Sequence, residues 1–245
     1  MTPEQLRDLL QSDPARAAST VQKLADQGII AAQLLFGRML LEGIGSIKSP
    51  AAAYAWFQRA AAHHHAEAIN MVGRCLENGW GTAPDAQRAF ACYARAAQLG
   101  DDWAQYNLGH MYLDGNGVTR DPALAMHWYA KASAQGHARA MNLLARCYEE
   151  GWGASKDAAQ AVDWYRRSAE AGYFRGQYNW ATVLMAMGRP DEAAAWLARA
   201  KQGATPAVHR AIADYVARSD QPSVHAPAAL SPDHLNVAMA TKRMD

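Results

Sequence analysis

Small and apolar residues recur along the chain with a period of 36 residues. Within residues 104–138 they form two stripes, each with the spacing of one face of an α-helix. The first stripe comprises Ala104, Leu108, Met111 and Tyr112. The second comprises Ala125, Trp128, Tyr129 and Ala132. The pattern therefore predicts two helices in each 36-residue unit, with Trp128 and its equivalent Trp164 mostly buried.

Polar and glycine columns at the same period predict where these helices begin and end. A glycine pair closes each first helix, because glycine adopts the left-handed backbone that a helix end and turn require. The pairs are Gly43/Gly45, Gly79/Gly81, Gly115/Gly117 and Gly151/Gly153. An N-cap column opens each second helix, since its side-chain oxygen accepts from the free N–H groups of the first turn. This column is Asp13, Ser49, Asp85, Asp121 and Asp157. A further glycine column ends the second helix: Gly28, Gly100, Gly136 and Gly172.

Two-helix units of this kind bury their apolar faces only by stacking on their neighbours, so we predict an all-α solenoid of 36-residue helix-turn-helix repeats. Residues 1–30 are expected to form an N-terminal cap and residues 31–204 five repeats, of which the fifth is degenerate. Residues 205–219 are expected to form a C-terminal capping helix, and residues 220–245 a flexible tail with a possible short helix.

The unit "AQYNLGHMYLDGNGVTRDPALAMHWYAKASAQGHA" at 104–138 resembles the Sel-one-like repeat, a relative of the tetratricopeptide repeat. The resemblance covers about residues 13–204 and is weaker in the first unit, where Ser46 replaces the usual valine, and in the fifth. It implies a right-handed superhelix that serves as a scaffold for protein–protein contacts without catalysis of its own. In some members cysteines bridge the two helices of a repeat. Cys75, Cys92 and Cys147 do not recur in every unit, so this feature is not carried over.

Composition narrows the function further. With 24 basic and 23 acidic residues, the chain has no strongly basic field for nucleic acid or for an anionic membrane. The N-terminal stretch lacks the apolar run of a secretory signal, and no transmembrane span is evident. Three cysteines without a C-x-x-C spacing favour reduced, buried thiols over a disulfide framework or zinc. We therefore expect a cytoplasmic protein, and its richness in arginine and alanine suggests a bacterial one.

No motif for catalysis or for phosphate binding is visible, and the glycine pairs are explained by helix ends. We therefore expect no enzyme and no cofactor. The rival hypothesis is an enzyme or binding protein for a peptide-like or cell-wall-derived ligand, with His110 as base and Asp114 as the carboxylate that orients it. A second alternative is a metal-handling protein that uses His63, His64 and His65. However, His64 lies in the glycine column between repeats, which favours a solvated turn and no metal site.

The face of the first helices opposite the apolar stripe is the candidate binding surface, which in a solenoid is normally concave. It carries guanidinium, amide and aromatic groups, which suit an extended, possibly acidic peptide or a partner protein. Its residues are Arg38, Asn70, Arg74, Trp103, Tyr106, Asn107, His110, Arg139, Asn142, Arg146, Arg175 and Tyr178.

Two features leave alternatives open. Arg38 and Arg146 each precede a glutamate by four residues, so intrahelical pairs with Glu42 and Glu150 could satisfy them. The binding surface is favoured because aromatic residues share its face. Trp80 and Trp152, each between the glycines of a turn, form a second patch that could be buried or could bind a partner or another copy. The oligomeric state cannot be predicted from the sequence.

Overall fold

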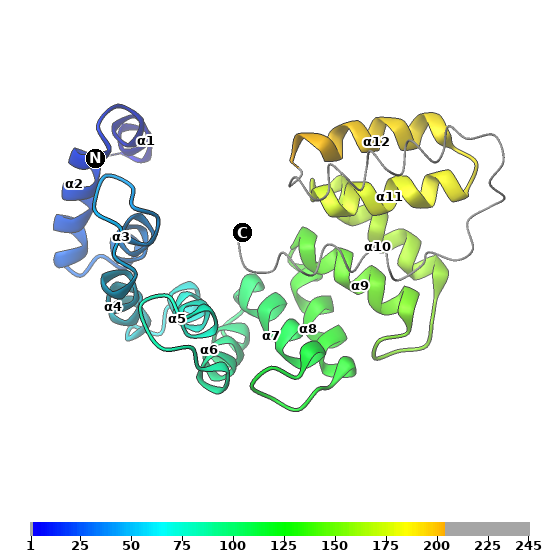
Figure 1. Ribbon diagram of the computed structural model, residues 1–245, viewed down its shortest axis with the longest axis horizontal. Coiled ribbons are helices and arrows are strands. Elements are labelled where there is room, and N and C mark those ends of the chain that lie inside the picture. The colour runs from blue at the N-terminus through cyan, green and yellow to red at the C-terminus, as the bar shows by residue number, and fades with distance from the viewer. Residues whose placement is uncertain (1, 204–245) are drawn as a thin grey trace. The chain divides into compact units, whose positions relative to one another are not determined.

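The computed structural model describes residues 2–203, which form twelve α-helices and no strand (Figure 1). In chain order the helices are α1 (Pro3–Ser12), α2 (Pro14–Asp26), α3 (Ile30–Glu42), α4 (Pro50–Ala61), α5 (Ala66–Asn78), α6 (Ala86–Gln98), α7 (Asp102–Asp114), α8 (Pro122–Ala134), α9 (Ala138–Glu150), α10 (Ala158–Glu170), α11 (Phe174–Ala186) and α12 (Pro190–Gln202). The all-α class and the helix-turn-helix repeat are confirmed.

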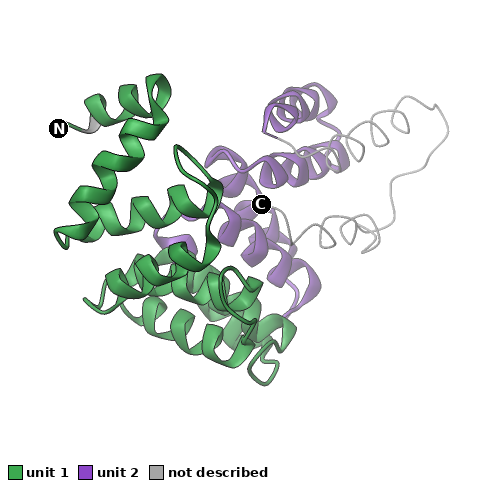
Figure 2. Ribbon diagram, turned by 60° about the vertical axis from the view of Figure 1, so that its left-hand side comes forward, with its two compact units in different colours: residues 1–128 green, residues 129–245 purple. Residues whose placement is uncertain are grey.

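The chain divides into two compact units, residues 1–128 and 129–245, with the boundary inside α8 (Figure 2). Within unit 1, helices α1 to α7 each pack against the next, and the first helices α5 and α7 also contact one another. Unit 2 repeats this arrangement: α9 packs on α10, α10 on α11 and α11 on α12, while α9 contacts α11. First helices thus pack on second helices, and α5 with α7 and α9 with α11 also pack on each other.

The predicted helix ends are confirmed by the backbone and its hydrogen bonds. Asp85 Oδ1, for example, accepts from the N–H of Arg88 at 2.9 Å, and the other four N-cap residues bond in the same way. At the other end, Gly79 closes α5 in the left-handed region with φ 72°. These local signals fix where the helices start and stop.

The core of each repeat centres on one aromatic column of the second helices. Phe57, Tyr93, Tyr129 and Tyr165 are fully buried or nearly so. The adjacent Trp128 and Trp164 pack at the margin of the core with most of their surface buried, so the prediction that they are mostly buried is confirmed. On α10, the guanidinium of Arg167 covers Trp164, with its carbon 4.6 Å from the ring centre.

The domain boundaries stay predictions. Helices α1 and α2 occupy the expected N-terminal cap, and α11 and α12 the expected fifth repeat. The predicted capping helix at 205–219 and tail at 220–245 lie outside the described residues.

The three adjacent histidines lie in the turn between α4 and α5. His64 has φ 58°, the left-handed conformation that glycine adopts at Gly28, Gly100, Gly136 and Gly172. Its Nδ1 lies 2.6 Å from a terminal guanidinium nitrogen of Arg95. Among the described residues, no three His, Cys, Asp or Glu side chains lie together as a metal site would require. The predicted turn is confirmed for His64.

Replacing His64 by glycine should therefore stabilise the protein. The left-handed region costs a non-glycine residue about 1–2 kcal/mol. Glycine loses more conformational entropy on folding, but this offsets only part of that gain. We expect the free energy of unfolding to rise by about 0.5–1 kcal/mol, as measured by urea unfolding at an unchanged m value. Gly100→His, in the equivalent turn, should lose a similar amount. A lower stability of His64→Gly would show that its contact with Arg95 matters more than the backbone.

Candidate functional site

The first-helix face comprises the twelve residues that the sequence predicted as the binding surface, and all of them lie on α3, α5, α7, α9 and α11. Those in unit 1 are Arg38, Asn70, Arg74, Trp103, Tyr106, Asn107 and His110. Those in unit 2 are Arg139, Asn142, Arg146, Arg175 and Tyr178. Each unit therefore presents its own part of the face.

Three residues of this face, Asn70, Asn142 and Arg146, are buried. The cause is the contact between first helices of successive repeats. Asn107 Nδ2 donates to Asn70 Oδ1 at 3.0 Å within unit 1, and Asn179 Nδ2 donates to Asn142 Oδ1 at 2.8 Å within unit 2. Part of the predicted amide set thus bonds one repeat to the next.

An aromatic cluster remains at the surface of α7. Trp103 is 43 % exposed and meets Tyr106 edge to face, with ring centres 6.1 Å apart. Tyr106 in turn meets His110 edge to face at 4.6 Å. Both ring nitrogens of His110 are buried, whereas Asp114 is exposed. The cluster therefore offers aromatic surface to a partner but no imidazole nitrogen to a substrate.

The arginines of this face do not use the intrahelical glutamates. Arg38 forms an ion pair with Glu67, which lies on the first helix of the following repeat. Arg146 forms no ion pair with Glu150 among the described residues; its guanidinium carbon lies 4.7 Å from the ring centre of Trp152. Arg74 lies over Trp80 in the same manner, at 5.1 Å.

The second predicted patch is therefore part of the same feature. Trp80 and Trp152 are partly buried, and each is covered by the arginine six residues earlier. This connection was missed from the sequence, although both arginines and both tryptophans share a spacing of two repeat periods. That shared spacing was the available signal.

A glutamate and a tyrosine accompany each pair and were also missed. The hydroxyl of Tyr93 donates to Glu77 Oε2 at 2.7 Å, and that of Tyr165 donates to Glu149 Oε2 at 2.6 Å. Burial raises the pKa of the Glu149 carboxyl above its ordinary value, although the Tyr165 hydrogen bond opposes this shift. The same two-period spacing relates these residues.

The cysteines next to these arginines are core residues. Cys75 and Cys147 are fully buried, in the column that Met39 and Met111 occupy in the other repeats. Burial raises the pKa of both thiols to about 12, so they stay protonated and unreactive at neutral pH. All three cysteines are free thiols.

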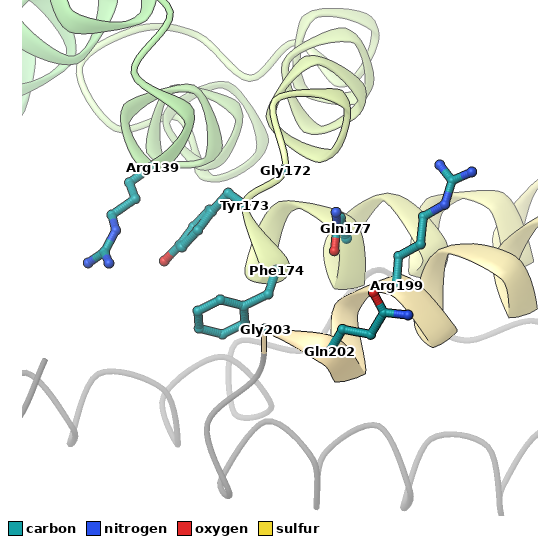
Figure 3. A pocket seen from close by; sticks show the side chains of 8 residues that line it. All are labelled: Arg139, Gly172, Tyr173, Phe174, Gln177, Arg199, Gln202 and Gly203. Atoms are coloured by element: carbon teal, nitrogen blue, oxygen red, sulfur yellow. The ribbon is translucent and has the colours of Figure 1, made fainter. Parts of the chain in front are cut away.

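Unit 2 also contains a pocket of about 510 Å³ at the start of α11 (Figure 3). It is lined by Arg139, Gly172, Tyr173, Phe174, Gln177, Arg199, Gln202 and Gly203. In the view of Figure 3 the side chains of Arg139, Tyr173 and Phe174 lie on one side and those of Gln177, Arg199 and Gln202 on the other. Of these residues, the sequence analysis predicted only Arg139. Arg199 and Gln202 belong to α12 and line the pocket because α12 packs against α11, which the sequence pattern does not show.

Comparison with known proteins identifies the family of these repeats. A family model for the Sel1 repeat matches residues 30–65, 66–101, 104–137 and 138–173. The structure is similar to a Sel1 repeat protein of Oxalobacter formigenes, with 30 % identity and a TM-score of 0.73 over 84 % of this chain and 90 % of that one. No curated protein matches the chain. None of the described helices is both long and apolar enough to cross a bilayer.

Two further structures show the same fold. A protective antigen of uropathogenic Escherichia coli strains, which displays an SLR fold, is 26 % identical with a TM-score of 0.70; the match covers 93 % of this chain but 49 % of the antigen. An immunity protein of Pseudomonas aeruginosa is 21 % identical, with a TM-score of 0.54 over 75 % of this chain and 72 % of that one. With four repeats matched over more than half of its length, the chain belongs to the Sel1 repeat family.

Proposed function

We propose that this protein is a non-catalytic adaptor that binds a partner protein or peptide on its first-helix face. Sel1 repeat proteins are generally scaffolds for protein interactions. The observation that carries the proposal is the surface cluster on α7, where the exposed ring of Trp103 meets Tyr106 edge to face. Tryptophan and tyrosine dominate binding hot spots because they bury a large area with few rotamers to fix.

Other observations support the remaining parts of the proposal. Arginines on α5, α9 and α11 give the face a positive character suited to an acidic partner. The near-neutral net charge does not favour nucleic acid. Three free thiols suit a reducing compartment such as the cytoplasm, and the structurally similar proteins named above come from bacteria.

Trp103→Ala should remove the partner without unfolding the protein. The full chain serves as bait in a lysate of its own organism, and captured proteins are quantified by mass spectrometry. Loss of an exposed tryptophan hot spot costs about 2 kcal/mol or more, which corresponds to at least about a thirtyfold lower affinity. The matched control is Leu124→Ala, which removes a 40 % exposed apolar side chain from the second helix α8.

The control variant should capture the same proteins as the wild type, and both variants should keep the unfolding midpoint within the range of surface substitutions. Equal capture by Trp103→Ala and by the wild type would contradict the proposal.

A further inference from the structure

Arg146 is a largely buried charged side chain, 8 % exposed. Its Nε is buried and has no hydrogen-bond partner among the described residues. A guanidinium stays charged at any pH that a protein experiences, so it cannot lower the cost of burial by losing its proton. Buried charges are normally paired and hydrogen-bonded. A group in this state therefore needs either an internal carboxylate or an external one.

The nearby carboxylates of the protein do not fill this role. Glu149 lies close enough for the charge of Arg146 to oppose the rise that burial causes in the pKa of its carboxyl, but its hydrogen bond is with the hydroxyl of Tyr165, at 2.6 Å. Neither Glu149 nor Glu150 forms an ion pair with Arg146. No carboxylate among the described residues pairs with this guanidinium. The Trp152 ring lies over the face of the guanidinium, with the guanidinium carbon 4.7 Å from the ring centre. Nε is the buried nitrogen of this group, so a carboxylate from outside would bind the two terminal nitrogens.

A second arginine of the same unit shows what an ordinary arginine–tryptophan stack looks like. Arg167 lies over Trp164 at 4.6 Å, nearly the distance between Arg146 and Trp152. Its side chain, however, is 50 % exposed and pairs with Asp163 at 2.7 Å. Stacking on tryptophan therefore does not in itself deprive an arginine of its acceptor.

The residues around Arg146 occur twice in the chain, once in each unit. The first copy is Arg74, Cys75, Glu77, Trp80 and Tyr93, and the second is Arg146, Cys147, Glu149, Trp152 and Tyr165. Arg74 is less buried, and within residues 2–203 its guanidinium donates to the thioether of Met71 at 3.8 Å, a weak acceptor.

The repeats in odd positions show that this set is not needed for folding. They carry Ile44 and Asn116 in place of the tryptophans, yet their first helices end in the same left-handed glycines. A set that the fold does not require, and that leaves a charge unpaired, calls for another explanation.

We propose that Arg146 with Trp152 is a carboxylate-binding site for an acidic segment of the partner protein, and that Arg74 with Trp80 is its second copy. This inference rests on the proposed function and names the chemistry that the partner must carry. The guanidinium edge binds a carboxylate with two parallel hydrogen bonds. A singly charged carboxylate fits better than a phosphate group, because Glu149 and Glu150 lie close and would repel the larger charge.

The test measures binding of a fluorescent hexaglutamate peptide, acetylated and amidated, to the full chain. Arg146→Met should weaken binding at least tenfold, and the double variant Arg74→Met, Arg146→Met should abolish it. Arg146→Lys, which keeps the charge but lacks the fork, should lose most of the affinity. Arg167→Met, the matched control, should bind within twofold of the wild type, and hexaglutamine should not bind.

Unchanged hexaglutamate binding by Arg146→Met would overturn the inference, and so would tighter binding of a hexaphosphoserine peptide. If Arg146→Met binds hexaglutamate normally while Trp103→Ala still loses its captured proteins, the carboxylate site is wrong and the interaction face stands. If both variants also capture the same proteins as the wild type, the proposed function fails as well. Should Arg146→Met not fold, Arg146→Lys and Arg74→Met decide the question.

Discussion

Replacing Gly81 by alanine should lower the free energy of unfolding by about 2–4 kcal/mol, after glycine's greater freedom in the unfolded chain is subtracted. Gly81 has φ 75°, which costs an L-residue about 1–2 kcal/mol. A Cβ at this position would also lie 2.1 Å from the carbonyl oxygen of Pro50, the first residue of α4. Because that atom belongs to the backbone of the preceding repeat, it cannot rotate away, and overpacking of this kind costs a further 1–3 kcal/mol or so.

The matched control is Gly100→Ala, which lies in the same unit. Gly100 has φ 94°, but a Cβ there meets nothing within 4 Å. It should therefore lose only the net backbone contribution, about 0.5–1 kcal/mol once glycine's greater freedom in the unfolded chain is subtracted. Urea unfolding of both variants measures the difference. Equal losses would show that the close approach between the second glycine and the preceding repeat does not contribute to stability.

Arg146→Met should raise the free energy of unfolding, by about 1–2 kcal/mol. Methionine fills much of the same volume without a charge, and replacing a poorly compensated buried charge by an apolar group is often stabilising by about 1–4 kcal/mol. The lost cation–π contact with Trp152 subtracts about 0.5–2 kcal/mol. A group that lowers stability while it improves binding is typical of a functional site.

The control for this prediction is Arg167→Met. It loses an exposed ion pair with Asp163, so its stability should fall by no more than about 1 kcal/mol. Thermal and urea unfolding of both variants gives the comparison. A loss of about 3 kcal/mol or more in Arg146→Met would mean that this arginine stabilises the fold as one partner of a buried pair.

The repeat and its boundaries could be predicted from the sequence because they depend on local signals. Asp85 caps α6 and Gly79 ends α5 through atoms a few residues away, so the residue type and its 36-residue spacing suffice. The buried column that contains Tyr93 follows from helical periodicity in the same way. The caps and helix ends do not depend on how one repeat packs against another.

The candidate site could be predicted only in part, because its details depend on packing between repeats. The helical wheel placed Asn70 and Asn142 on the correct side of their helices. It could not show that the next first helix lies close enough to bury them. Arg38 likewise forms its ion pair with Glu67 of the next repeat and not with Glu42 of its own helix, because the next repeat packs close by. The stacking of Arg146 on Trp152 depends on the path of the turn after α9, where Trp152 lies. A helical wheel shows only which residues share a face of a helix, so it cannot predict this contact.

The measurement that tests the central claim most directly is the ¹H–¹⁵N resonance of the Arg146 Nε–H during titration with hexaglutamate. The Nε–H has no acceptor among residues 2–203 and belongs to the same delocalised guanidinium as the terminal nitrogens, so a carboxylate bound at those nitrogens should move its resonance in a saturable manner. The Nε–H of Arg167, which already has Asp163 beside its guanidinium, should hardly move. An Arg146 resonance that stays fixed while the peptide binds would show that the acidic segment is recognised elsewhere, and it would contradict the account.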